Sequence, residues 1–208
     1  MFDRKRRRVL FAVLSVLVAT NTLHAQQAAE IVNIVTPSTQ DVYLAGRSVN
    51  ILSAVTGDAI IAGQRINVTQ PVSEDIIAAG ERINLDADIG DDLRAAGRII
   101  SVNAKIGDDS ILAGETITLG RDSRVAGRAW VAGRSVEIAG QLGSELRAAA
   151  QDITISGRIK GNVHLIAENI EVLPGANIAG DFSYRSPREA KIAAGATISG
   201  KLTRLEME

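Results

Sequence analysis

Apolar and polar positions alternate along most of the chain, and the alternation returns with a fixed period. A marker residue, usually the glycine of an Ala-Gly pair, recurs first every 17 residues and later at steps of 17 or 19. The markers are Gly46, Gly63, Gly80, Gly97, Gly114, Gly133, Ala150, Ala167 and Ser186. Two alternating apolar residues follow each marker except the last, as Val49 and Ile51 do. A period of this length indicates a repeat protein rather than a series of independent domains.

Each repeat holds three short stretches of the β type, separated by Gly, Asp or Asn. In the first repeat the apolar positions are Val42 and Leu44, then Val49 and Ile51, then Val55. An apolar spacing of two residues predicts strands, whereas a helix needs a spacing of 3.6. One 17-residue unit is too small to bury a face alone, but stacked units bury every apolar column in one core.

We therefore expect an all-β fold over residues 26–208: a single-stranded parallel β-helix, or triangular solenoid, of about nine turns. Right-handed winding is expected because connections between parallel strands are right-handed by default. The 19-residue steps add residues between two apolar columns, as between Leu119 and Val125. We expect such extra residues to enlarge one corner and to leave the columns in register.

The N-terminus has the pattern of an export signal. Five basic residues at 4–8 precede an apolar run of eleven residues at 9–19. A helix needs about 20 apolar residues to cross a bilayer, so we predict a signal peptide over residues 1–25. An uncleaved signal anchor is the alternative. Both interpretations export the remainder to the periplasm or cell envelope, anchored in the inner membrane if the signal is uncleaved.

Composition excludes several kinds of site. The chain has 208 residues, no cysteine and two histidines, so it lacks disulfides, thiolate metal sites and a cysteine nucleophile. Aromatic residues make up 3% of the chain, so the core must be aliphatic. A dispersed charge with a formal net value of −1 gives no sign of nucleic-acid binding.

Acidic residues recur at one corner of the predicted coil. Asp58, Asp75, Asp92 and Asp109 share one slot of the repeat. Oxygen-rich clusters of this kind suit Ca²⁺, but the nine-residue glycine-rich repeat of calcium-binding β-rolls is absent. Turn formation by Asp is the favoured interpretation, so we expect no cofactor and treat the four carboxylates only as weak metal candidates.

One outward position carries large side chains. Alternation places Tyr43, Trp130 and His164 there, together with three isoleucines, Ile60, Ile77 and Ile111. This strip is a candidate surface for a partner; scattered exposed apolar residues are the plainer alternative. His164 has no evident serine or acid beside it in the sequence, and no long insertion could build a catalytic loop. We therefore expect no catalytic residues.

The ends of the predicted solenoid lack long polar caps. We expect apolar residues near both ends to take part in self-assembly: Ile31, Ile34, Ile192, Ile198 and Leu202. Uncovered strand edges pair with other chains, and a head-to-tail contact that does not close produces a filament.

Residues 153–202 resemble the bactofilin family of polymer-forming bacterial cytoskeletal proteins. The matching segments are residues 155–162 (ISGRIKGN), 167–172, 174–176 (PGA) and 195–200. The resemblance implies a right-handed triangular β-helix that assembles end to end without nucleotide and has no catalytic residues. Typical bactofilins are cytoplasmic, so the predicted signal peptide would make this chain an exported variant.

Two functions follow as hypotheses. The first is a non-enzymatic structural protein that forms a head-to-tail homopolymer, a scaffold at the cell envelope, with envelope proteins or peptidoglycan as further candidate partners. The second is a monomeric exported binding module or surface rod that holds a polysaccharide or a protein.

Overall fold

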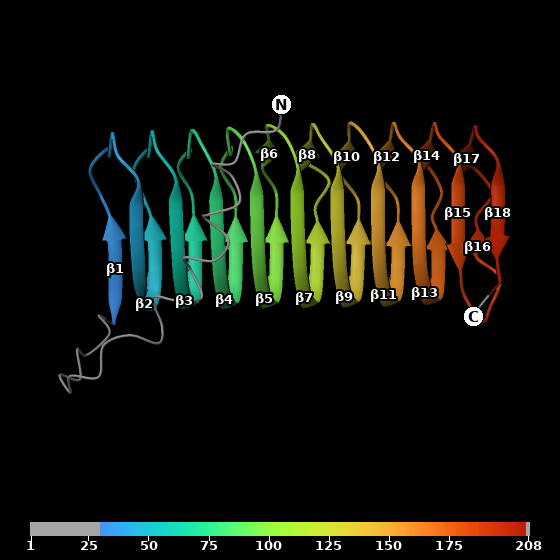
Figure 1. Ribbon diagram of the computed structural model, residues 1–208, viewed down its shortest axis with the longest axis horizontal. Coiled ribbons are helices and arrows are strands. Elements are labelled where there is room, and N and C mark those ends of the chain that lie inside the picture. Colours follow the sequence, from blue (N-terminus) through green and yellow to red (C-terminus); the bar gives the residue numbers. More distant parts are fainter. Residues whose placement is uncertain (1–29, 207–208) are drawn as a thin grey trace, which may run out of the picture.

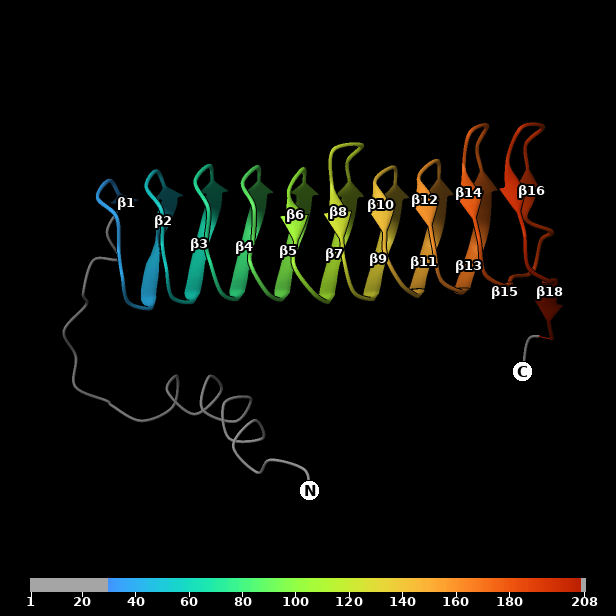
Figure 2. The same cartoon turned by 90° about the horizontal axis from the view of Figure 1, so that it is seen from above.

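The computed structural model describes residues 30–206, which form one straight all-β solenoid (Figures 1 and 2). Parallel strands stack along the long axis in about ten coils, and successive coils lie mostly 17 residues apart. The predicted fold class is therefore confirmed. The count exceeds nine because β1 (Ile31–Ile34) adds a partial coil before the first marker glycine. The predicted signal peptide, residues 1–25, lies outside the described residues.

Two parallel sheets make up the walls of the solenoid. The larger contains β1 and β2 (Val42–Ile51), β3 (Ala59–Val68), β4 (Ile76–Leu85), β5 (Leu93–Val102), β7 (Ser110–Leu119), β9 (Ala129–Ile138), β11 (Leu146–Ile155), β13 (Val163–Val172), β15 (Phe182–Arg185), β16 (Lys191–Ile192) and β18 (Leu202–Leu205). The smaller contains β6 (Lys105–Ile106), β8 (Arg124–Val125), β10 (Gln141–Leu142), β12 (Arg158–Ile159), β14 (Asn177–Ile178) and β17 (Thr197–Ile198). Single bridges from Ser38 to Ile106 extend the smaller sheet toward the N-terminal end.

Two of the three predicted stretches are joined in one ten-residue strand. In β3, Ala59 and Ile61 are buried and the next buried residues are Ile66 and Val68. The five-residue step between Ile61 and Ile66 reverses the alternation, so the strand bends around Gly63. Our expectation of a break in the strand at each Ala-Gly pair is wrong, because Gly63 stays in the ladder, paired with the marker glycines of both neighbouring coils.

The bend needs a residue without a side chain. A Cβ on Gly80 would lie 2.3 Å from the carbonyl oxygen of Gly63 in the coil before it. Glycine permits this close approach of one backbone to another. Ala150 occupies the same slot later in the chain, and there the ladder between β9 and β11 passes from the pair Ala132–Ala149 directly to Ser135–Asp152.

Aliphatic columns fill the interior, as the repeat predicts. Val49, Ile66, Ile83 and Ile100 are neighbours in successive coils and are completely buried. Ser110 interrupts one column: it is completely buried, and its hydroxyl has no hydrogen-bond partner among the described residues. Near the C-terminal end, Phe182 and Tyr184 add aromatic rings to the core.

The 19-residue steps enlarge one corner, as expected. After the longer loop at residues 120–123, Val125 still pairs with Ile106 before it and Leu142 after it. Two later corner loops turn at Gly175 and Gly195, whose φ values of 87° and 90° favour glycine. These loops stand out beyond the others in Figure 2.

Candidate functional site

The aspartates of the acidic corner join one coil to the next. Each carboxylate accepts, through Oδ1, the backbone N–H of the residue in the same slot of the following coil, at 2.6–3.1 Å. The series runs through Asp41, Asp58, Asp75, Asp92 and Asp109. The N–H donor lies in the next coil rather than in the aspartate's own turn, which the sequence pattern alone did not indicate. These side chains therefore supply acceptors for the backbone N–H groups of this slot, while the backbone carbonyls of the same slot accept N–H groups of the preceding coil.

Arginines pair with the second oxygens of this corner. Arg94 contacts Oδ2 of Asp75 at 3.2 Å and of Asp92 at 2.7 Å, and Arg128 contacts Oδ2 of Asp109 at 2.8 Å. Burial raises the pKa of Asp109, but the backbone N–H and guanidinium of Arg128 together lower that pKa below its usual value. The three carboxylates of Asp75, Asp91 and Asp92 lie within 4.8 Å of one another, and Arg94 already occupies this position. Hydrogen bonds to the backbone and ion pairs with arginines account for these aspartates, and we assign no metal to the corner.

The outward strip divides into separate parts. Along the stacked strands its order is Tyr43, Ile60, Ile77, Arg94, Ile111, Trp130, Arg147, His164 and Ser183. Tyr43 is highly exposed and lies on β2, five strands along the sheet from Trp130 on β9. Trp130 and His164, by contrast, border one groove. The structure thus brings two of the three predicted surface residues together and leaves Tyr43 apart.

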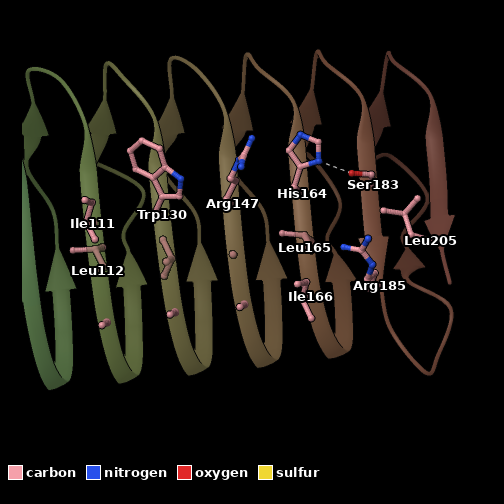
Figure 3. A pocket seen from close by; sticks show the side chains of 15 residues that line it. Ile111, Leu112, Trp130, Arg147, His164, Leu165, Ile166, Ser183, Arg185 and Leu205 are labelled. Carbon is pink, nitrogen blue, oxygen red and sulfur yellow. Dashed lines mark hydrogen bonds between the residues drawn. The ribbon is translucent and has the colours of Figure 1, made fainter. Parts of the chain in front are cut away.

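The groove has a volume of about 530 Å³ and runs over the outer face of β7, β9, β11, β13, β15 and β18 (Figure 3). This volume is within the range of small-molecule sites. Exposed alanines of one column line it beside the taller side chains of the neighbouring column; they are Ala113, Ala132 and Ala149. Its polar side chains gather toward the C-terminal coils: Arg147, His164, Ser183 and Arg185.

His164 is the centre of a hydrogen-bonded network. Its Nδ1 lies 2.6 Å from Ser183 Oγ, and its Nε2 lies 3.2 Å from Glu145 Oε1. Arg147 Nε donates to the same Glu145 oxygen at 2.7 Å. Our sequence interpretation of His164 as lacking a serine or acid neighbour is wrong. The repeat contained the missing signal, because Ser183 follows His164 by 19 residues in the same slot.

An acid, a histidine and a serine in this order are also the parts of a serine-hydrolase triad. Such enzymes add backbone N–H groups that stabilise the oxyanion of the transition state. Strand β15, which carries Ser183, is paired on both sides, with β13 and β18. Its backbone N–H groups are therefore used by the ladder, and the described residues provide no oxyanion hole from this strand.

At the N-terminal end, no described strand covers the outer edge of β1. Val32 and Ile34 stack on the buried Val49 and Ile51 and are themselves only partly buried. Ile31 pairs with Ser48, outside the inward columns, and its side chain is 63% exposed. Ile34 therefore lies where the alternation predicts, Ile31 faces sideways, and Val32 was missed.

At the C-terminal end, apolar side chains of the last coil are exposed, and one arginine makes hydrogen bonds there. Ile192, Ile198 and Leu202 pair with the inward residues Val172, Ile178 and Phe182, respectively, and no described coil covers them. Ile192 and Leu202 are consequently 37% and 48% exposed. Arg204, which sequence reasoning missed, pairs with Tyr184 and donates to the carbonyl oxygens of Ser186 and Pro187, each at 3.0 Å.

Comparison of the chain with protein-family models, curated proteins and solved structures gives no match in any of the three. Over residues 30–206, the structure contains no helix long and apolar enough to span a membrane. The function is therefore inferred from the geometry of the rod, its two ends and its groove.

Proposed function

We propose that the chain is a non-enzymatic structural protein whose rods join end to end into a polymer that serves as a scaffold at the cell envelope. The proposal rests on the difference in side-chain exposure between the last coil and the coil before it. Ile192 and Leu202 are 37% and 48% exposed, whereas Val172 and Phe182, one coil earlier in the same columns, are at most 1% exposed. Covering these side chains with another coil would be favourable, because apolar area is removed from water.

The first coil of a second copy is suited to cover the last coil of the first copy. Its β1 strand ends the larger sheet with an edge that no described strand covers, and β18 ends the same sheet at the other end. Both edges belong to parallel strands, so the last coil of one copy can stack on the first coil of the next in the direction used inside each rod. Such a head-to-tail contact involves different surfaces on the two copies and does not close, so it extends into a filament.

The sequence adds two supports. Residues 153–202 resemble bactofilins, which polymerise in this manner, and the predicted signal peptide at 1–25 is the basis for an envelope location. Peptidoglycan and envelope proteins are the partners that this location would offer.

Sedimentation velocity on residues 26–208 tests the proposal. Ile192→Arg places a charge at the exposed end and is expected to shift the protein toward monomers, while circular dichroism stays β-rich. Tyr43→Arg is the matched control, because Tyr43 is also exposed but lies on the side of the rod. An unchanged sedimentation profile for Ile192→Arg would contradict the proposal.

A monomeric binding module is the second candidate, favoured by one observation: the groove that Trp130 and His164 border. A protein that stays monomeric at every concentration but binds a ligand through this groove would support the second candidate against the first.

A further inference from the structure

We propose that the groove beside Trp130 binds a single-chain amphiphile with an anionic head, namely a long-chain fatty-acid anion. This binding activity goes beyond a scaffold role and does not depend on end-to-end assembly. It rests on the apolar lining at one end of the groove, an arginine that has no ion-pair partner within the described part of the chain at the other, and the distance between them.

The end of the groove over β7 and β9 is apolar, and Ala149 extends this surface onto β11, the strand that also carries Arg147. Ala113, Ala132 and Ala149 line it, and the larger side chains of Ile111 and Trp130 stand beside them (Figure 3). A column of short side chains beside a column of taller ones leaves a groove for a narrow chain, and the exposed Ile166 continues the column of short side chains toward Arg185. A sugar in this channel would lose water from its hydroxyl groups with few protein partners to replace it, and that loss is unfavourable. A hydrocarbon chain has no such groups, so the lining favours an acyl chain over a glycan.

The end over β13 and β15 supplies the cation. Arg147 pairs with the carboxylate of Glu145, which His164 Nε2 also contacts, so this acid already compensates the charge of the Arg147 guanidinium. Arg185 lines the same groove, is exposed, and has no ion-pair partner among residues 30–206. Charge complementarity therefore indicates an anionic head at Arg185.

The separation of the two ends gives the length of the ligand. Four strand steps lie between Ile111 on β7 and Arg185 on β15, which corresponds to about 19 Å at the usual strand spacing. A fully extended chain advances about 1.2 Å per bond, so this span fits about 16 bonds. The length indicates a fatty acid of the palmitate class rather than a short carboxylate.

Trp130 provides a direct reporter of binding. It is the only tryptophan of the chain, and it lines the groove. The guanidinium of Arg128 lies 4.6 Å from the centre of its ring and pairs with Asp109, which holds the indole in place. An acyl chain in the groove would contact the indole and shift its emission to shorter wavelength.

The test is a titration of the full chain with monomeric palmitate, followed by Trp130 fluorescence. We expect a saturable blue shift with one site per chain. Arg185→Gln is expected to weaken binding about tenfold, the loss typical of one charge-assisted hydrogen bond. Ala149→Glu puts a carboxylate into the floor of the groove and is expected to abolish the shift. Ala62→Glu is the matched control, because Ala62 occupies the same exposed column on β3, away from the groove, and should bind as the wild type does.

Several outcomes would overturn the proposal. One is the absence of a saturable shift; another is equal binding by Ala149→Glu and Ala62→Glu, with all variants β-rich by circular dichroism. Unchanged affinity in Arg185→Gln, or equal affinity for the methyl ester of palmitate, would refute the anionic-head assignment. A shift with phosphatidylglycerol vesicles but not with monomeric palmitate would show a surface for bilayers instead.

Discussion

Asp92 Oδ1 accepts the backbone N–H of Asp109 at 2.9 Å across the boundary between two coils. A side-chain oxygen here accepts an N–H that a backbone carbonyl accepts elsewhere in the ladder, while the carbonyl of Asp109 accepts the backbone N–H of Leu93. The same bond recurs in most coils, and it makes the corner a column of stabilising contacts rather than a row of repelling charges.

Replacing Asp92 separates its hydrogen bond from its charge. Asp92→Ala leaves the N–H of Asp109 without its acceptor and is expected to lower the free energy of unfolding by about 1–3 kcal/mol. Asp92→Asn keeps an acceptor, as Asn162 does for the N–H of Asp181, and loses only the partly exposed pairing with Arg94, worth less than about 1 kcal/mol. Urea unfolding followed by circular dichroism measures both. Equal losses for Ala and Asn would show that the hydrogen bond is unimportant.

Acid is expected to weaken the corner through Asp109. Burial alone would raise the pKa of Asp109, yet the N–H and guanidinium of Arg128 bring that pKa below its usual value. A carboxyl group with a lowered folded pKa stabilises the fold above its unfolded pKa of about 3.9, and this contribution is lost as the pH falls through the folded pKa. Asp109→Asn cannot make this contribution. The difference in melting temperature between wild type and Asp109→Asn should therefore be larger at pH 7 than at pH 3; a constant difference would contradict this assignment.

A substitution at Ser110 is expected to stabilise the core. The hydroxyl of Ser110 is buried without a partner, so Ser110→Ala should raise the free energy of unfolding by about 1 kcal/mol. Ser123 is the matched control, because it is equally buried but its hydroxyl donates to the Gly120 carbonyl at 2.7 Å. Ser123→Ala should lower stability, and a gain from both substitutions would contradict this explanation.

Ser183 should be inert as a nucleophile. Its hydroxyl contacts His164, but β15 is paired on both sides and offers no oxyanion hole. A fluorophosphonate probe is expected to leave Ser183 unlabelled, with an active serine hydrolase as the positive control. Labelling that disappears in Ser183→Ala, detected by mass spectrometry of the peptide, would show an enzyme and refute the non-enzymatic proposal.

The interior of the fold was predictable because its pattern is local. Alternation with a period of two orients Val49 and Ile51, and the 17-residue period then stacks each on its counterpart, Ile66 and Val68. The bend at Gly63 was harder to predict. A continuous strand that bends and two strands joined by a turn give the same reversal of the apolar alternation in the sequence.

The repeat period identifies which residues of the site lie in neighbouring coils, but it does not identify which side chains make contact. The pairing of His164 with Ser183 and Glu145 requires that side chains from three coils reach across the outer face. Slot assignments bring such residues near one another, but side-chain conformations decide which of them meet. The ends were also incompletely predicted, since the closing position of Arg204 depends on its register with Tyr184.

Electron microscopy of purified residues 26–208 over a range of concentrations tests the central claim most directly. End-to-end stacking predicts unbranched filaments one rod wide that lengthen with concentration and are lost in Ile192→Arg. Uniform single rods at the highest concentration, with a β-rich circular dichroism spectrum, would contradict it.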